Sequence, residues 1–304
     1  MSKVRSSYGR NIYRKVQNRA QSINTQRLLT AENLAWLNDA FRAHNWRVDM
    51  ANTASCFNRF RRTLSTLTSE EQSLLLSLTM RFEHLPMTTY LDLMIPILQN
   101  LRNDYPDDYI YFVRCIKEED VGKIKSCETV LYQLKGTSVL QKIDLGEYSV
   151  VDDFKDIDVN MVKKREAIIV LVDDYMGTGD TAKGAIEYLI KCVPQLSACD
   201  KDRFCLLTLA AYEGGKHSFE SLGHKVYVSV VQNKGITDYY KDEECSHNVQ
   251  IMTGIEHKLT GLSKRFRFGY GQTEGLICME RCPNNTFPIY WFKEGDAPYE
   301  RKRS

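Results

Sequence analysis

The residues with the clearest chemistry in this sequence stand between an apolar run and a helix. Asp173 and Asp174 end the apolar run, and a short glycine-rich loop follows. Glycines let a backbone turn tightly and bring its N–H groups close to an anion, and the start of the next helix adds partial positive charge, so a phosphate suits this loop. Two carboxylates suit the hydroxyls of a ribose, or Mg²⁺, which prefers oxygen ligands. The segment predicts a phosphorylated-sugar site, with a phosphate-binding loop made of Gly177, Thr178, Gly179, Asp180 and Thr181.

Other glycine-rich loops fit this segment less well. A P-loop follows the pattern GxxxxGK[ST], and no lysine stands where that pattern requires it. A dinucleotide-binding loop follows GxGxxG, and the third glycine is missing. The remaining alternative is a plain turn in which Thr178 or Thr181 caps the helix. The succession of apolar run, acidic pair, loop and helix favours the binding loop, in which a side chain at Gly179 is expected to fill the space of the phosphate.

The elements predicted around this loop belong to an α/β core. Short runs rich in β-branched and aromatic residues predict strands at 109–116, 130–136, 167–172, 203–212 and 225–231. The third and fourth runs are apolar throughout, which is typical of strands covered by helices on both faces. A helix expected at 181–193 predicts a right-handed crossover in a parallel sheet, with the loop at its ligand-binding edge. The polar stretch 136–166 predicts a long loop or an inserted arm.

The chain before this core is predicted to be helical and to follow a basic arm. Residues 1–29 contain seven lysines and arginines and no acidic residue, so they predict a positively charged arm. Within 30–106 apolar residues recur at helical spacing, Thr68 and Glu71 form a capping pattern, and Pro96 interrupts the last helix. We therefore divide the chain into this arm, a helical subdomain at 30–106 and an α/β domain at 107–304.

The composition excludes several classes of protein. The 304 residues, 43% of them hydrophobic and with a net charge of +2, suffice for a sizeable core. The chain holds no apolar stretch of about 18 residues and no apolar segment behind its first charges, which argues against a membrane span or a secretory signal. Nine cysteines without a CxxC pair indicate reduced thiols and no zinc-finger site. We expect a cytoplasmic protein that does not bind membranes.

The segment Val-Leu-Val-Asp-Asp-Tyr-Met-Gly-Thr-Gly-Asp-Thr, at 170–181, resembles the signature of type I phosphoribosyltransferases. The resemblance implies the fold class, an α/β protein with a parallel-sheet phosphoribosyltransferase-like core behind a helical N-terminal extension. It also implies that Asp173 and Asp174 are catalytic residues that bind the ribose hydroxyls of phosphoribosyl pyrophosphate together with Mg²⁺. The loop at 177–181 would then cradle the 5′-phosphate.

A second segment, 282–291, narrows the resemblance. Its Pro-Asn-Asn-Thr and Trp pattern is similar to that of the bacterial conflict-system phosphoribosyltransferase-like (PRTase-CE) branch, some of whose members are associated with retrons. The branch implies an antiphage effector, toxic when active and held in check by a partner. Two departures stand out, because Gly177 replaces an acidic residue that exchanges a proton with the base in purine-using members, and Asp180 adds negative charge to a phosphate loop.

Further groups would complete such a site. The stretch after the 109–116 strand offers Arg114, Lys117, Lys123, Lys125 and Ser126. Of these, Arg114 and Lys117 are our candidates for the pyrophosphate side, unless they belong to a solvated turn. The candidates for the base side are Tyr212, Asn284 and Asn285, although an Asn-Asn pair also suits a turn. The run at 264–271 alternates cations with aromatics, as nucleic-acid surfaces do, but we favour a strand with one buried aromatic face.

These patterns together predict a Mg²⁺-dependent phosphoribosyltransferase-like enzyme. Its substrate is phosphoribosyl pyrophosphate or a related nucleotide, attacked by an acceptor or by water. The alternative is a non-catalytic sugar-phosphate or nucleotide sensor, or a nucleic-acid-binding subunit of a defence complex. Through the basic arm we expect a nucleic-acid partner or, failing that, a protein partner.

The arm generates a prediction of its own. If it binds phosphates, the logarithm of the affinity for nucleic acid falls linearly with the logarithm of the salt concentration, and deletion of residues 2–28 flattens that slope by several units. Tyr8 and Tyr13 are interleaved with the cations and would stack on bases. A salt series with single-stranded and duplex nucleic acid compares the full chain with the truncated one. Equally weak binding with equal slopes would contradict the prediction and favour a protein partner.

Overall fold

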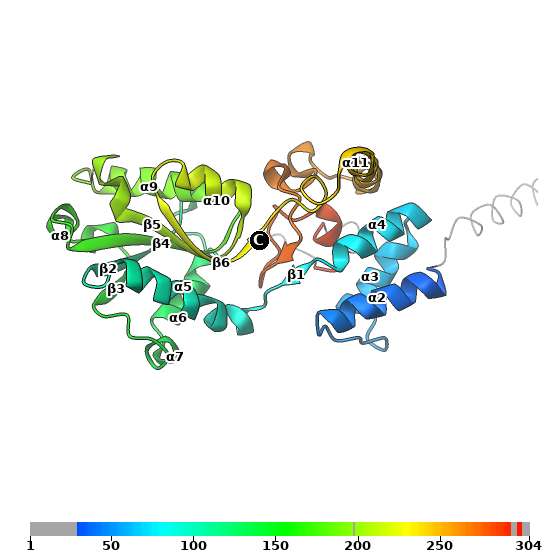
Figure 1. The fold of residues 1–304 in the computed structure, drawn as a ribbon, viewed down its shortest axis with the longest axis horizontal. Helices are drawn as coiled ribbons and strands as arrows, with labels where there is room; N and C mark the ends of the chain where they lie inside the picture. The colour runs from blue at the N-terminus through cyan, green and yellow to red at the C-terminus, as the bar shows by residue number, and fades with distance from the viewer. Residues whose placement is uncertain (1–28, 197, 293–296, 300–304) are drawn as a thin grey trace, which may run out of the picture.

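The computed structural model describes residues 29–196, 198–292 and 297–299. The predicted basic arm lies outside the described residues, apart from Leu29 at its end. Figure 1 shows two lobes, an α/β lobe built around a parallel sheet and a smaller lobe of helices. No helix within the described ranges is both long enough and apolar enough to cross a bilayer.

The sheet has five parallel strands in the order β3-β2-β4-β5-β6. The long strands β4 (Ala167–Met176) and β5 (Phe204–Tyr212) are buried over almost their whole length, as their continuous apolar runs predict. The sheet is completed by β2 (Tyr109–Arg114), β3 (Tyr148–Val151) and β6 (Lys225–Gln232). The predicted α/β fold with a parallel sheet is therefore confirmed.

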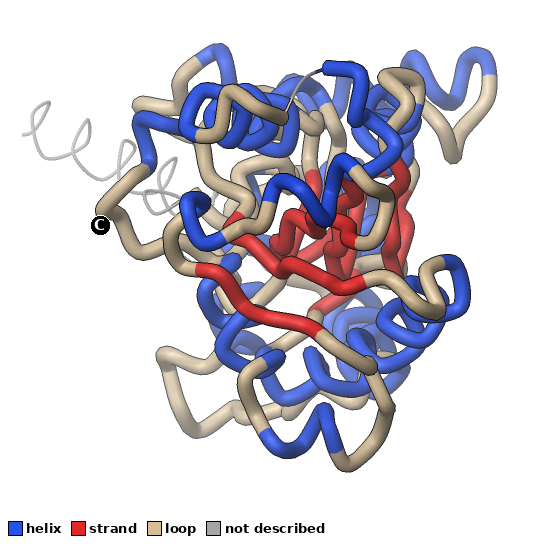
Figure 2. The backbone as a smooth tube through the Cα atoms, turned by 90° about the vertical axis from the view of Figure 1, so that its left-hand side faces the viewer, coloured by secondary structure: helices blue, strands red, loops and turns tan. Residues whose placement is uncertain are grey.

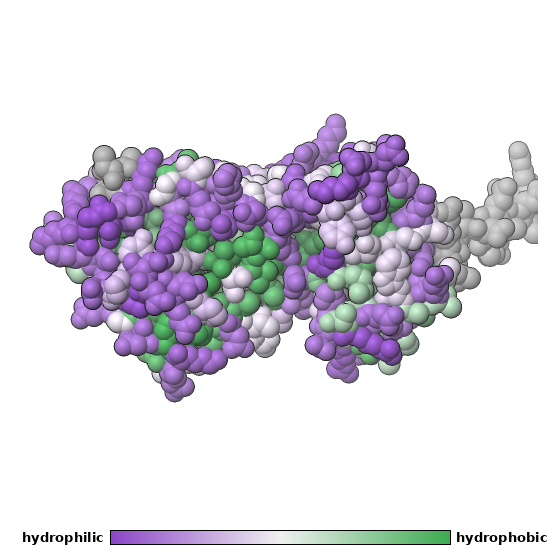
Figure 3. Space-filling model, in the orientation of Figure 1, coloured by the Kyte–Doolittle hydropathy of each residue, from purple (hydrophilic) through white to green (hydrophobic). Residues whose placement is uncertain are grey.

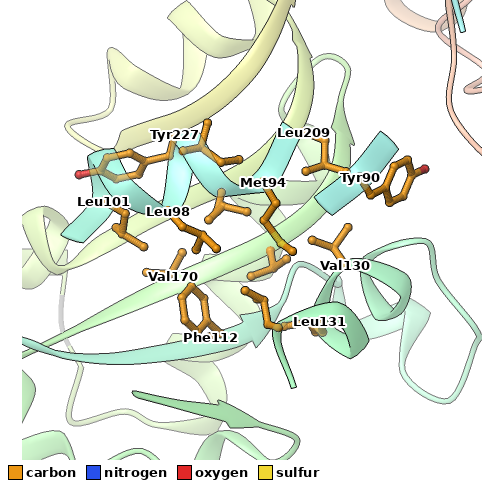
Figure 4. Packing of buried hydrophobic residues seen from close by; sticks show 14 of the residues in the cluster. Tyr90, Met94, Leu98, Leu101, Phe112, Val130, Leu131, Val170, Leu209 and Tyr227 are labelled. Atoms are coloured by element: carbon orange, nitrogen blue, oxygen red, sulfur yellow. The ribbon is translucent and has the colours of Figure 1, made fainter. Parts of the chain in front are cut away.

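Helices cover both faces of this sheet (Figure 2). On one face, α5 (Tyr90–Asp104), α6 (Cys127–Leu134) and α7 (Thr137–Leu140) share a core with alternate residues of the central strands, and Figure 4 shows part of it. On the other face, α8 (Val159–Lys163), α9 (Asp180–Cys192) and α10 (Glu213–Glu220) pack on the remaining residues. Because successive strand residues point to opposite faces, β4 contributes to both cores.

A separate core joins the helical lobe to the C-terminal part of the chain. Helices α2 (Ala31–Ala43), α3 (Cys56–Ser65) and α4 (Ser69–Thr79) pack with α11 (Asp242–His257) and residues up to Phe292. The short strands β1 (Glu83–His84) and β7 (Ile277–Cys278) pair beside it. The packing thus crosses the 106/107 boundary, because α5 lies on the sheet and the C-terminal segment returns to the helices. The proposed domain ranges stay a prediction.

Local signals explain where several helices begin. Thr68 and Glu71 form the predicted capping box of α4. Thr30 caps α2 by accepting from the Asn33 backbone N–H. Pro96 lies inside α5, which runs on to Asp104. The remaining short helices are of the 3-10 type and span Met87–Thr89, Glu118–Asp120, Phe154–Asp156, Ala198–Arg203, Lys264–Phe266, Tyr270–Gln272 and Pro288–Tyr290.

Three sequence-based expectations about elements are wrong. Residues 130–134 of the run at 130–136 belong to helix α6 rather than to a strand, because Cys127, Val130, Leu131 and Leu134 are buried at helical spacing. Strand β3 lies inside the stretch 136–166, which we expected to be a loop or arm. The favoured strand at 264–271 is absent as well.

That last segment cannot be a strand because of its backbone. Phe268, Gly269 and Gly271 have φ values of 57°, 77° and 69°, which extended chains do not adopt. Two 3-10 turns take the place of the strand, and the second of them carries Tyr270. The aromatic residues therefore do not share one buried strand face.

The surface is mostly hydrophilic on the face shown in Figure 3. Apolar residues gather over β6 and α5 in the middle of that face. In these two elements, Val231 of β6 is exposed and Leu93 of α5 is half-buried. Strand β6 is one of the two edge strands of the sheet within the described residues, and β3 is the other. The carboxyl end of β4, near the middle of the sheet, opens into the cavity described next.

Candidate functional site

A cavity of about 520 Å³ opens at the carboxyl end of β4. This is the edge where parallel sheets place ligands. Its walls come from parts of the chain that are far apart in sequence. They are the start of α5 at Tyr90, the connection from Cys115 to Thr129, the segment from Asp173 to Ala182, Tyr270, and the segment from Glu280 to Asn285.

The cavity gathers most of the residues that the sequence analysis singled out. It is lined by Asp173, Asp174, Gly177, Thr178, Gly179, Asp180, Thr181, Lys117, Asn284 and Asn285. Two candidates are not among the lining residues. Arg114 instead lies 3.7 Å from Glu128 and donates to the Asp152 carbonyl, while Tyr212 ends β5 with its ring next to Gly214.

The acidic pair lies inside β4, not after it. The strand does not end at Val172 as expected, but continues to Met176. Asp174 is therefore buried, with only 5% of its surface exposed, and Asp173 is half-buried. Asp174 thus lines the cavity as a buried carboxylate rather than as one exposed to solvent.

Hydrogen bonds hold the two carboxylates in place. Asp173 Oδ1 accepts from the Asp174 backbone N–H at 2.9 Å and from Ser126 Oγ at 3.4 Å. Asp174 Oδ2 lies 3.4 Å from the hydroxyl of Tyr90, which donates to it. Burial raises the pKa of both acids, and the charge of Asp174 raises the pKa of Asp173 further, while Lys125 acts in the opposite direction on Asp173.

This donor set fits a magnesium ion that arrives with a substrate. Mg²⁺ is usually bound through one or two carboxylates together with substrate phosphates and water. Asp173 and Asp174 offer two adjacent carboxylates, and a cation would offset the charge of Asp174, which together with burial raises the pKa of Asp173. Among the described residues there is no cluster of three or more histidine, cysteine or acidic side chains that could hold a metal alone.

The predicted phosphate loop is a tight turn into α9. Gly179, with φ of 84°, precedes the first residue of that helix, in a region that side chains other than glycine rarely adopt. Thr178 Oγ1 donates to Asp180 Oδ2 at 2.8 Å, so the extra carboxylate is bonded within the loop. A Cβ at Gly179 would meet Met176 Cε at 3.1 Å and the Gly215 carbonyl oxygen at 3.3 Å. A side chain at Gly179 would therefore start out toward α10, and the expectation that it fills the phosphate space stays a prediction.

Helix α10 and the segment around Asn285 both pack closely against this loop. A Cβ at Gly215 in α10 would overlap the carbonyl oxygen of Gly177, so only glycine allows this approach. From the other side, the Asn285 side chain packs against Gly177. Asn285 Nδ2 donates to the Tyr270 carbonyl at 3.0 Å and its side chain is buried, so this candidate base-side residue also ties the C-terminal segment to the loop.

Several cavity residues were not chosen from the sequence. Lys125 and Ser126 line the cavity, whereas Arg114 is held by Glu128 and the Asp152 carbonyl. Tyr90 and Glu280 reach it from α5 and from the segment after β7. Tyr270 belongs to the run at 264–271, which we expected to form a strand rather than part of the cavity. No local pattern identifies these residues, since their contacts join distant parts of the chain.

Comparison with known families identifies the chain. The PRTase-CE family model matches residues 68–301. The protein belongs to the PRTase-CE family. The match includes the acidic pair, the loop and the Asn-Asn segment, and it begins in the helical part, before the α/β range. No curated protein matches the chain.

The glycine contact at the loop generates a prediction. Gly215→Ala should lower the free energy of unfolding by about 1–3 kcal/mol and weaken ligand binding, because the new methyl group displaces the phosphate loop. Gly254→Ala is the matched control, since it also lies in a helix and its Cβ would meet nothing closer than 3.7 Å. It should stabilise by about 0.4–1 kcal/mol. Urea titration measures the free energy of unfolding of both variants. Equal changes in the two variants would contradict the close contact at Gly215.

Burial of the acidic pair makes the free energy of unfolding depend on pH. Because both pKa values are raised in the folded state, their favourable contribution is complete below about pH 4 and is lost as the pH rises through the folded-state values. The double variant Asp173→Asn with Asp174→Asn has no ionisable groups at these positions, so it lacks this decrease of the free energy of unfolding with pH. The variant should therefore gain stability relative to the unmodified protein between about pH 5 and pH 8. Urea titrations across this range measure the difference, and a constant difference would show that the pair titrates normally.

Proposed function

We propose that this protein is a Mg²⁺-dependent phosphoribosyltransferase-like enzyme that acts on phosphoribosyl pyrophosphate or a related nucleotide. The observation that carries the proposal is the meeting of the acidic pair, the phosphate loop and two lysines in one cavity. Its volume of about 520 Å³ lies within the range of small-molecule sites. Membership of the PRTase-CE family supports the same reaction class.

Each wall of the cavity suits one part of this substrate. The loop at 177–181 and the start of α9 would hold the 5′-phosphate through backbone N–H groups. Asp173 and Asp174 would accept hydrogen bonds from the ribose hydroxyls and hold Mg²⁺. Lys117 and Lys125, from the connection after β2, would face the pyrophosphate; Lys125 meanwhile pairs with Asp120 at 2.8 Å.

The residues would act by position and charge. The acidic pair and the loop would fix the ribose so that its anomeric carbon faces the acceptor, while the lysines stabilise the charge that grows on the departing pyrophosphate. Bound Mg²⁺ supplies further neutralisation of that pyrophosphate. The bond from the anomeric carbon to the pyrophosphate oxygen breaks, and a bond to an acceptor nitrogen, or to water, forms. The first loop position is Gly177, so the loop itself supplies no general base there.

A non-catalytic sensor is the second candidate. Two observations favour it. Gly177 supplies no acid or base, and the Asn285 amide already donates to the Tyr270 carbonyl, so neither residue offers a free group for a reaction at the base. Such a protein would keep the sugar-phosphate site and signal its occupancy. For either candidate we propose a cytoplasmic role in antiphage defence, with a nucleic-acid or protein partner at the basic arm.

Turnover separates the candidates. With Mg²⁺ and phosphoribosyl pyrophosphate, the enzyme should release pyrophosphate, and Asp173→Asn with Asp174→Asn should lower the rate at least about 100-fold. Asp92→Asn is the control, because that carboxylate is exposed and pairs with Lys142 outside the cavity. Circular dichroism checks that each variant is folded.

The same assay has two other outcomes. If calorimetry shows Mg²⁺-dependent binding but the assay shows no turnover, the enzyme proposal is wrong and the sensor proposal is supported. Neither binding nor turnover in the unmodified protein would contradict both candidates.

A further inference from the structure

The hydroxyl of Tyr90 lies at a junction between three parts of the cavity. Tyr90 is the first residue of α5, and its side chain is 1% exposed. Its hydroxyl donates to Asp174 Oδ2 at 3.4 Å and accepts from the Glu280 backbone N–H at 3.1 Å. One oxygen thus joins the acidic pair on β4 to the segment that follows β7.

The ring of Tyr90 is held firmly enough to position this hydroxyl. Tyr90 belongs to the core that α5 forms with the sheet, and Figure 4 shows it at one end of that helix, beside Met94 and Leu209. A second contact joins the turn before α5 to the segment after β7, because the Met87 backbone N–H donates to Glu280 Oε2 at 3.1 Å. The packing of the ring and the contact of Met87 with Glu280 together therefore fix the position of the hydroxyl.

The segment that starts at Glu280 leads to the phosphate loop. It lines the cavity as far as Asn285, which packs against Gly177 and donates to the Tyr270 carbonyl. The contacts form a closed path, from Asp174 through Tyr90 to Glu280, along the chain to Asn285, and back to the loop that follows Asp174. Two side chains outside the segment 170–181 complete this path, those of Tyr90 and Asn285.

We propose that Tyr90 is a positioning residue, which orients the Asp174 carboxylate and couples it to the segment 280–285. For its ligand this inference rests on the proposed function. Removing the hydroxyl leaves a buried carboxylate oxygen and a backbone N–H without this partner, and such losses are costly in the interior. Asp174 then turns away from the ribose side, and the segment 280–285 loses its connection to the acidic pair.

A double-mutant cycle on stability tests the contact without any ligand. Urea titrations compare the unmodified protein with Tyr90→Phe, Asp174→Ala and the double variant, because alanine has no oxygen that could accept from the Tyr90 hydroxyl. We expect the unfolding equilibrium constants to be non-multiplicative by about five-fold or more. Tyr148→Phe is the matched control, because its hydroxyl also has one acceptor, the Leu134 carbonyl at 3.1 Å, and its ring packs on the same core. A cycle of Tyr148→Phe with Asp174→Ala should be multiplicative. A multiplicative result for Tyr90 overturns the inference.

A binding measurement tests the role of the contact. In calorimetry with Mg²⁺ and phosphoribosyl pyrophosphate, Tyr90→Phe should raise Kd about ten-fold, and Tyr148→Phe should leave it unchanged. Hydrogen exchange of the Glu280 amide should become faster in Tyr90→Phe alone. An unchanged Kd in a folded Tyr90→Phe protein overturns the positioning role. If the unmodified protein binds nothing, the proposed function fails, and the stability cycle with the exchange measurement still decides whether Tyr90 holds Asp174 and Glu280.

Discussion

The burial of β4 is the constraint on which the rest of the structure depends. Residues 167–172 of this strand are fully buried, so helices must cover both faces of the sheet. The same strand continues into Asp173 and Asp174, and burial disfavours the charged forms of these acids. The pair is compatible with the fold because it lies where the strand reaches the cavity and where Ser126, Tyr90 and the backbone donate to it. A site that gathers negative charge at the end of an apolar strand is well suited to a cation or to sugar hydroxyls.

The cavity is assembled by close approach of distant segments. Helix α10 reaches the phosphate loop because Gly215 has no side chain, and Asn285 reaches it from the C-terminal segment. That segment also packs with α2, α3 and α4 in the second core, which links the helical lobe to the site. The family match agrees with this arrangement, because it spans α4 and α5 as well as the sheet. Helices α2 and α3 lie before the matched residues, although they share the second core with α4 and the C-terminal segment.

The sequence allowed some of this to be predicted and not the rest, for physical reasons. The central strands and the loop could be predicted because their signals are local, a continuous apolar run and a glycine-rich turn. The run at 130–136 was misassigned because its buried residues are also at helical spacing once Cys127 is included. The turns near Tyr270 depend on positive φ values, some at residues other than glycine, such as Phe268, which composition does not signal. The contact of Tyr90 with Asp174 joins positions 84 residues apart, and no pattern in one sequence indicates it.

The most direct test of the account is a crystal structure of the protein with phosphoribosyl pyrophosphate and Mg²⁺. The account predicts the 5′-phosphate against the backbone of residues 177–181, the ribose hydroxyls at Asp173 and Asp174, and the pyrophosphate toward Lys117 and Lys125. It also predicts that the Tyr90 hydroxyl is hydrogen-bonded to Asp174 in this complex. Electron density for the ligand away from the acidic pair, or a cavity that stays empty at saturating ligand, would contradict it.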